Sequence, residues 1–148
     1  MKTIIISTIF FLLFSAGLYS QNKNNVRLET SELEDGGMKK EYIQLDRKGA
    51  KDVSKVVYIY SPSGQCTERI FSMWNNRAGW EHSQKHEYTY SASGKLATII
   101  HTRWDKSSGD WQRTSDLLTH VYDENDNLKS VIKSEKMDAG LYYTQLRK

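Results

Sequence analysis

A four-residue turn pattern recurs along this chain and limits what it can fold into. A small polar residue is followed by two variable residues and then by Gly or Asp, at Asp46–Gly49, Ser61–Gly64, Ser91–Gly94 and Asp123–Asp126. The pattern is typical of a type I turn that ends in a left-handed residue and closes a short β-hairpin loop. Gly suits the positive φ at the fourth position, and Asp126 is a tolerable substitute. The repeat therefore predicts a series of β-hairpins.

A second kind of turn, flanked by aromatic residues, alternates with the first. It occurs at Trp74–Trp80 and Trp104–Trp111, and in degraded form at Lys136–Tyr142. The segments between turns are rich in β-branched and aromatic residues, and no helical periodicity competes after the first 20 residues. The expected strands are Val26–Leu33, Met38–Leu45, Lys51–Tyr60, Cys66–Trp74, Trp80–Tyr90, Lys95–Trp104, Trp111–Tyr122, Asn127–Glu135 and Leu141–Arg147.

The sequence thus predicts an all-β fold, an antiparallel meander of about nine strands built from hairpin repeats. A curled sheet or an open, barrel-like sheet is expected, with a single-layer extended sheet as the alternative. Pairing across two turns places many rings on one face and sets Glu68 opposite His86. The residues expected on this face are Tyr60, Cys66, Ile70, Trp74, Trp80, His82, His86, Tyr88, Tyr90, Leu96, Ile100 and Trp104. The odd spacing of Trp111 and Tyr122 predicts a bulge, placed at Leu117-Leu118.

The N-terminus resembles a secretory signal peptide. Lys2 precedes an uncharged run from Thr3 to Leu18, and small residues follow up to Ser20. We expect residues 1–20 to be removed and residues 21–148 to form one exported domain of the periplasm, cell surface or extracellular space. A transmembrane anchor is the alternative, but the run is shorter than the roughly 20 residues of a spanning helix. No transmembrane segment is expected after cleavage.

Charge and cysteine content narrow the possible partners. The formal net charge is +3, and basic and acidic residues are interspersed, so nucleic acid is not an expected partner. Cys66 is the only cysteine, which excludes an internal disulfide, and we expect it to be a small apolar residue.

Two segments carry a resemblance to known repeats. Tyr88-Thr-Tyr-Ser-Ala-Ser-Gly-Lys-Leu and His120-Val-Tyr-Asp-Glu-Asn-Asp-Asn-Leu resemble the hairpin unit of YD (RHS-type) repeats. Together with the signal peptide and the Trp-Asp…Gly-x-Trp turns, they resemble small exported Bacteroidales proteins grouped as a domain of unknown function (number 3836). The resemblance implies a Gram-negative exported protein with a repetitive β-fold, and it carries no established activity. The last unit departs from the pattern, since Lys136-Met137 replaces Trp-Asp.

The tryptophans at the hairpin tips are the candidate ligand-binding residues. Exposed rings beside amide and carboxylate groups can stack on sugars and bond their hydroxyls, whereas paired tryptophans also clamp a hairpin end. The candidates are Trp74, Trp80, Trp104, Trp111, Asn75 and Asp105. A binding module for an oligosaccharide or an envelope protein is the leading hypothesis. The oligomeric state is left open.

Two other classes of function are kept as alternatives. Glu68 and His86 could form an acid–base pair in a small hydrolase, although a cross-strand ion pair would look the same. The terminal strands could add to other sheets in a structural assembly module. No phosphate loop, dinucleotide fingerprint or other catalytic motif is present, so no cofactor is expected. His82 and His86, about 13 Å apart along one strand, cannot share a zinc ion, so no metal site is expected.

Overall fold

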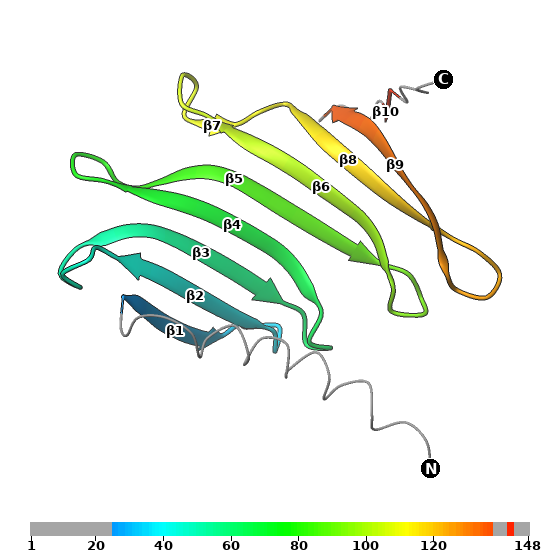
Figure 1. Ribbon diagram of the computed structural model, residues 1–148, viewed down its shortest axis with the longest axis horizontal. Helices are drawn as coiled ribbons and strands as arrows, with labels where there is room; N and C mark the ends of the chain where they lie inside the picture. The colour runs from blue at the N-terminus through cyan, green and yellow to red at the C-terminus, as the bar shows by residue number, and fades with distance from the viewer. Residues whose placement is uncertain (1–24, 138–141, 144–148) are drawn as a thin grey trace, which may run out of the picture.

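A computed structural model describes residues 25–137 and 142–143, and the expected signal peptide lies outside them. These residues form one antiparallel sheet in the order β1-β2-β3-β4-β5-β6-β8-β9-β10, with β7 pairing β6 (Figure 1). The strands are β1 (Val26–Glu32), β2 (Met38–Leu45), β3 (Asp52–Tyr60), β4 (Cys66–Asn75), β5 (Gly79–Tyr90), β6 (Leu96–Asp105), β7 (Asp110–Trp111), β8 (Thr114–Tyr122), β9 (Leu128–Met137) and β10 (Tyr142–Tyr143).

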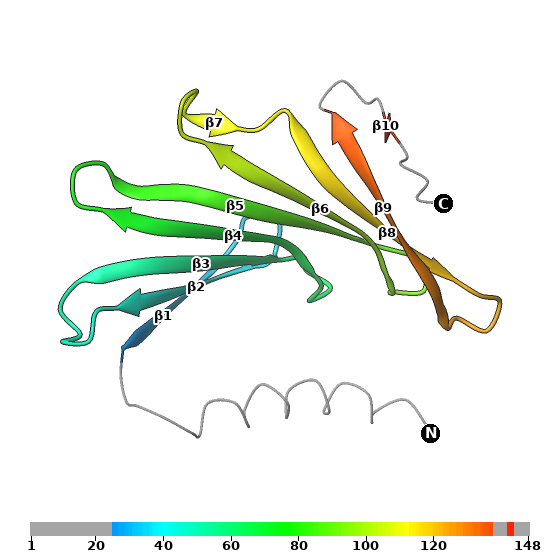
Figure 2. The same ribbon diagram turned by 45° about the horizontal axis from the view of Figure 1, so that its top comes forward.

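The predicted all-β meander is confirmed, and the sheet is twisted and open. The strands with the lowest and highest numbers lie at opposite edges in both ribbon views, so the sheet does not close into a barrel (Figures 1 and 2). Every strand of the described residues belongs to this one layer. None of these residues forms a helix that could span a membrane. Of the expected last strand, Leu141–Arg147, only β10 lies within the described residues.

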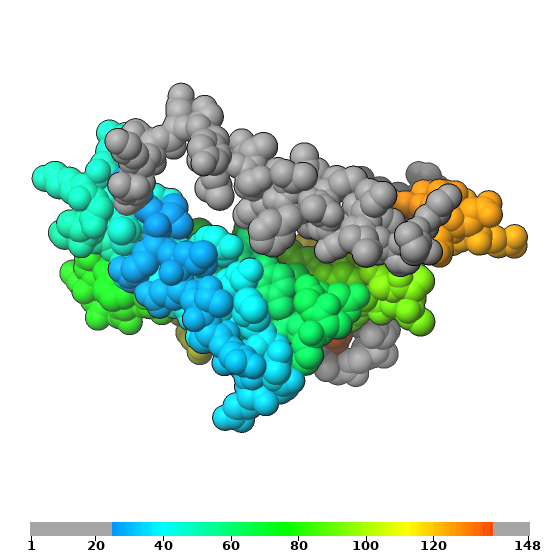
Figure 3. All heavy atoms as spheres, turned by 90° about the horizontal axis from the view of Figure 1, so that it is seen from below, coloured from blue at the N-terminus to red at the C-terminus, as the bar shows by residue number. Residues whose placement is uncertain are grey.

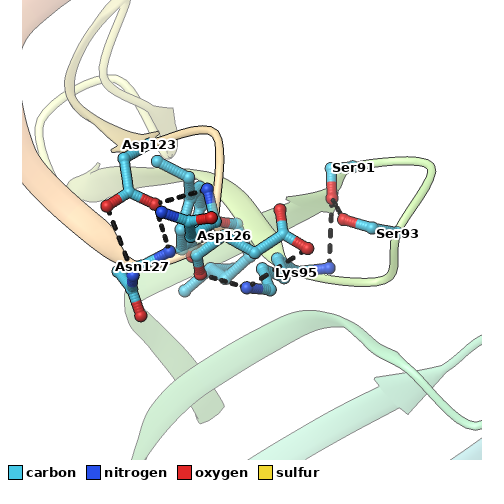
Figure 4. Close-up of polar contacts among 9 residues, drawn as sticks. Ser91, Ser93, Lys95, Asp123, Asp126 and Asn127 are labelled. Atoms are coloured by element: carbon cyan, nitrogen blue, oxygen red, sulfur yellow. Dashed lines mark hydrogen bonds and ion pairs between the residues drawn. The ribbon is translucent and has the colours of Figure 1, made fainter.

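The turns form as their residues dictate. In each of the four repeats the fourth residue donates its amide hydrogen to the carbonyl of the first, at 2.8–2.9 Å. Asp126 is the only non-glycine residue with positive φ among the described residues, at 65°, and Gly94 occupies the same position of its own turn at 81°. Lys95 joins these two neighbouring turns through contacts with Asp126 (Figure 4).

β-Bulges interrupt the register that simple counting predicts. Tyr90 pairs with Leu96, but Thr89 already pairs with Thr98, so Ala97 is an extra residue in β6. In the same way, Thr67 is an extra residue shortly after the turn Ser61–Gly64, and Lys129 is an extra residue shortly after the turn Asp123–Asp126. Within β5, Ser72 pairs with His82 and Phe71 with Gln84, which leaves Ser83 unpaired.

The bulges divide the rings between two faces, so the expectation of one ring-rich face was wrong. One face carries Trp74, Trp80, His82, Trp104 and Trp111, and we call it the tryptophan face. The opposite face carries Tyr42, Tyr58, Tyr60, His86, Tyr88 and Tyr90, and we call it the tyrosine face. Side chains alternate along a strand, and an extra residue reverses the alternation beyond it. Ser83 therefore moves His86 and Tyr88 away from His82.

Burial is concentrated on the tryptophan face. Its pairings include all five buried side chains of the described residues, Ile43, Val57, Ser72, Thr102 and Leu117. Three of these are apolar, which is a small core for a sheet of this size. Stability must therefore depend largely on the strand ladders and on cross-strand side-chain pairs.

The segment expected to be one strand from Trp111 to Tyr122 is broken into two. Trp111 pairs with Trp104, but the next strand, β8, begins at Thr114. Its pairing with β6 begins only at Asp116, which lies opposite His101. The irregularity lies at Gln112 and Arg113, and pairing through Leu117 and Leu118 is regular, so the expected position of the bulge was wrong. The break leaves part of β6 without a continuous neighbouring strand.

Candidate ligand-binding face

Five rings lie at the tips of two hairpins in two contacting groups, Trp74 with Trp80 and His82 with Trp104 and Trp111, and together we call them the tryptophan cluster. Trp74 and Trp80 meet edge to face with centroids 5.2 Å apart, and Trp104 and Trp111 do the same at 5.1 Å. His82 contacts the second pair, with its ring 5.1 Å from Trp104 and 5.3 Å from Trp111. The hairpin turns bring each Trp pair together, and pairing of β5 with β6 brings His82 beside the second pair.

The cluster is open to solvent on its outer side. Trp74 is 41% exposed, and the other three tryptophans are half-buried. Beneath the rings, the hydroxyl of Ser72 lies 3.1 Å from Nδ1 of His82, and Ser72 is only 1% exposed. The His82 ring is thus held by a buried hydroxyl on the side of the sheet, while the cluster is accessible to solvent on its outer side. The rings clamp the hairpin ends and also offer a surface.

Two lysines border the rings. The ammonium of Lys55 lies 4.7 Å from the Trp80 ring centroid, and that of Lys85 lies 5.3 Å from Trp111. Each lysine also has a carboxylate partner, Glu41 at 3.3 Å and Glu87 at 3.1 Å respectively. The surface around the rings is therefore close to neutral, with hydrogen-bond donors and acceptors side by side.

A hollow of about 230 Å³ opens next to Trp111, where β7 and β8 separate. Its wall combines the indole of Trp111 and the apolar side chain of Ile100 with polar groups that can bond hydroxyls. The polar residues are Lys85, Glu87, Thr102, Asp110, Gln112, Ser115 and Lys136. The hydroxyls of Thr102 and Ser115 hydrogen-bond each other at 2.7 Å. An aromatic wall with convergent polar groups is typical of a small-ligand site.

The polar groups expected at the tips are already used within the loops. Oδ1 of Asn75 accepts a hydrogen bond from the amide of Arg77 at 2.9 Å. Asp105 accepts bonds from the amide and the hydroxyl of Ser107, and these bonds hold the pKa of its carboxyl below the usual value. Asn75 and Asp105 therefore shape the loops that carry the rings.

Glu68 and His86 do not face each other. Glu68 pairs with Glu87 on the tryptophan face, whereas His86 pairs with Arg69 on the tyrosine face, so the expected acid–base pair is wrong. Burial raises the pKa of Glu68 and lowers that of His86. The reason for the error is the bulge at Ser83, which reverses the face of every residue after His82 in β5.

His101 lies beside His86, with ring centroids 4.7 Å apart, although simple counting placed the two on opposite faces. The described residues contain no group of three or more potential metal ligands. Cys66 is half-buried, and burial raises the pKa of its thiol.

The chain matches no family model, and searches of curated proteins and of solved structures found no significant match. The site must therefore be judged on its geometry. Counting along the sequence found the four tryptophans but missed Lys85, Thr102 and Gln112, which line the hollow. The odd spacing between Trp111 and Tyr122 was the available signal, since it required an irregularity somewhere in this segment.

Proposed function

We propose that this chain is a non-enzymatic, exported binding module that binds a neutral oligosaccharide on its tryptophan face. The observation that carries the proposal is the position of Trp111, which belongs both to the ring cluster and to the wall of the polar hollow. A sugar ring has apolar faces that stack on an indole and hydroxyls that need donors and acceptors at its rim. Trp111 supplies the first, and Thr102, Gln112 and Ser115 supply the second.

The electrostatics of this face favour a neutral ligand. Lys85 and Lys55, the cations beside the rings, are each paired with a carboxylate, so an anionic sugar would have to displace an existing ion pair. A neutral sugar can bond both members of such a pair without separating them. The indoles are also distributed over two hairpin tips as two edge-to-face pairs, so they offer separate stacking positions, which suits an oligosaccharide better than a monosaccharide.

Fluorescence titration tests this proposal directly. The protein, purified after any processing of its N-terminus, is titrated with cellopentaose, maltopentaose, laminaripentaose and mannopentaose. At least one should shift the tryptophan emission with saturable affinity. Trp111→Ala should weaken that affinity by about two- to tenfold, since one aromatic contact contributes about 0.5–1.5 kcal/mol. The matched control is Tyr42→Ala on the tyrosine face, which should leave it unchanged.

Calorimetry of the same titrations guards against a fluorescence artefact. If no pentaose binds by either method, the oligosaccharide proposal is abandoned. If binding is found but survives Trp111→Ala, the site lies elsewhere on the molecule.

A second candidate function, assembly through the sheet edges, is favoured by the distribution of exposed apolar side chains. Six of the ten large hydrophobic side chains that are exposed in the described residues belong to edge strands: Val26, Leu28, Leu128, Val131, Ile132 and Met137. The β1 edge faces the viewer in Figure 3. Among the described residues, β10 pairs with only Lys136 and Glu135 of β9, and Leu128–Ser134 of β9 has no neighbour on that side, a length equal to the seven residues of β1.

A second copy of the chain could therefore add its β1 to the free part of β9. Sedimentation velocity at rising protein concentration should then reveal growing species. Leu28→Lys should suppress them, and Val53→Lys, at a similarly exposed position on the inner strand β3, should not. A strictly monomeric protein across the concentration range contradicts edge pairing and leaves the sugar proposal intact.

A further inference from the structure

The tyrosine face carries a straight row of basic and aromatic side chains. Successive strand pairings place Lys40 beside Tyr58, Tyr58 beside Arg69, Arg69 beside His86 and His86 beside His101. We call these five residues the basic row. It crosses the neighbouring strands β2 to β6, and at about 4.8 Å per strand it extends over roughly 19 Å.

Side-chain contacts agree with the row. The guanidinium of Arg69 lies 5.9 Å from the ring centroid of Tyr58. The imidazoles of His86 and His101 are nearly parallel, with centroids 4.7 Å apart. The ammonium of Lys40 lies over a neighbouring ring, 5.4 Å from the centroid of Tyr60. The cations are therefore held against flat aromatic groups on the open surface of a sheet.

The two permanent cations of the row, Lys40 and Arg69, have no counter-charge beside them among the described residues. Among the described residues, no ion pair involves Lys40, Arg69 or His86, and Nε of Arg69 is buried with no hydrogen-bond partner. His101 alone has a carboxylate, Asp116 at 3.6 Å. Leaving Nε of a guanidinium buried without a hydrogen bond is costly, because burial removes water from a charged group.

On the opposite face, by contrast, lysines contact a carboxylate. There Lys39 and Lys55 lie 2.7 Å and 3.3 Å from the carboxylate oxygens of one residue, Glu41. Beside Arg69, β3 supplies Tyr58 and β5 supplies His86, and neither can carry a negative charge near neutral pH. Lys40 and Arg69 therefore lack the carboxylate contacts that Lys39 and Lys55 have.

The tyrosines around the row can donate hydrogen bonds to an anion. Burial raises the pKa of Tyr60 to about 12 and also raises the pKa of Tyr88, so both hydroxyls stay protonated at neutral pH. The ring of Tyr88 lies 6.3 Å from His86, next to the middle of the row. Charge, donors and flat rings thus occur together, as the recognition of an acidic sugar requires.

We propose that the basic row binds an acidic oligosaccharide that lies across the strands, with Arg69 at the centre holding a carboxylate or sulfate group. The guanidinium fork suits bidentate pairing with a planar or tetrahedral oxyanion. Lys40, two strands away at about 10 Å, reaches a second acidic group on the same ligand. This site lies on the face opposite the tryptophan cluster and does not rest on binding there.

Isothermal titration calorimetry with three probes tests the proposal on the protein purified after any processing of its N-terminus. The probes are oligogalacturonate, its methyl ester and a sulfated galactose oligomer of the same length. At least one acidic probe should bind, with an affinity that falls as salt rises, and the neutral ester should not bind to this face. Which acidic probe binds more tightly identifies the anionic group.

Arg69→Gln removes the central charge and should weaken binding of the acidic probe by roughly tenfold or more. The matched control is Arg77→Gln in the β4–β5 loop, which changes the net charge equally and should alter affinity little. Arg69→Lys should fall between the two, because it keeps the charge and loses the fork. A circular dichroism spectrum and a urea unfolding midpoint equal to those of the parent protein show that each variant is folded.

Proton NMR of the unmodified protein gives a readout that needs no variant. The ring signals of His86 and His101 should move when the acidic probe is added and stay in place with the ester. The proposal is overturned if neither acidic probe binds, if Arg69→Gln binds as tightly as the parent, or if a single-stranded RNA of similar charge binds more tightly than both sugars.

Discussion

The contact between Ser72 and His82 can be tested as the polar anchor of the tryptophan cluster. Ser72 is 1% exposed, and its hydroxyl lies 3.1 Å from Nδ1 of His82. His82→Phe keeps a flat ring against Trp104 and Trp111 but leaves the buried hydroxyl of Ser72 without this partner. An unpaired buried hydroxyl costs about 1–3 kcal/mol. We expect the free energy of unfolding of His82→Phe to fall by that amount.

A double-mutant cycle separates the hydrogen bond from the packing. Ser72→Ala alone should cost less, about 0.5–1.5 kcal/mol, because half-buried His82 can turn to water. In the double variant neither polar group remains, so its loss should be smaller than the sum of the single losses by about 1 kcal/mol or more. Urea unfolding followed by circular dichroism measures all four proteins.

The control for this cycle is Thr89→Val, which removes an exposed hydroxyl contact with Thr98 at 2.7 Å and should change stability little. Additivity of Ser72→Ala and His82→Phe within about 0.3–0.5 kcal/mol would refute the reasoning, because it would mean that the two groups do not interact. The ring contacts alone would then hold the cluster.

Three further predictions concern the backbone and pH. Gly37→Ala should lower the free energy of unfolding by about 1–3 kcal/mol, because an added Cβ would lie 2.4 Å from the carbonyl oxygen of Tyr60; unchanged urea unfolding would contradict this. Gly94→Ala should cost about 1 kcal/mol, because its φ is 81°, and a neutral result in the same assay would mean that the turn relaxes. Burial lowers the pKa of His86 below 6.5, so its contribution to stability should be full above pH 6.5 and fall as the pH drops toward the lower pKa of the folded state. In thermal unfolding measured across pH, His86→Gln should flatten this fall. An unchanged slope would exclude His86 as the source of the pH dependence.

The strands and turns of this chain could be predicted because their signals are local. The left-handed position of each repeated turn is occupied by Gly or Asp, and the strands begin and end close to those residues. Register beyond the turns is a different problem. Ala97 and Ser83 carry no feature that distinguishes an extra residue from a paired one, yet each shifts the pairing of every residue that follows. One uncounted residue was enough to place His86 on the wrong face.

The candidate site shows the same limit. The tryptophan pairs were predictable because each closes a hairpin and its partner is set by one short loop. The hollow beside Trp111 depends on where β7 ends and β8 begins, and the sequence indicated only that an irregularity was needed. A polar pair such as Gln112-Arg113 is compatible with an exposed strand as well as with a break. Tertiary pairing decides between them.

The bulge at Ser83 also explains how an open sheet can offer two unlike surfaces. Without it, the tryptophans and the tyrosines of β5 would share one face, and the other face would carry mostly short polar and charged groups. With it, both faces have rings that stabilise cross-strand neighbours, although few side chains are fully buried. These rings stabilise the fold by packing against one another, and they are also accessible to solvent. A ligand that covers either face therefore removes apolar area from water. Ligand binding should therefore raise the unfolding temperature in step with its affinity, and a sugar that binds without stabilising the fold would have to bind the unfolded chain as well.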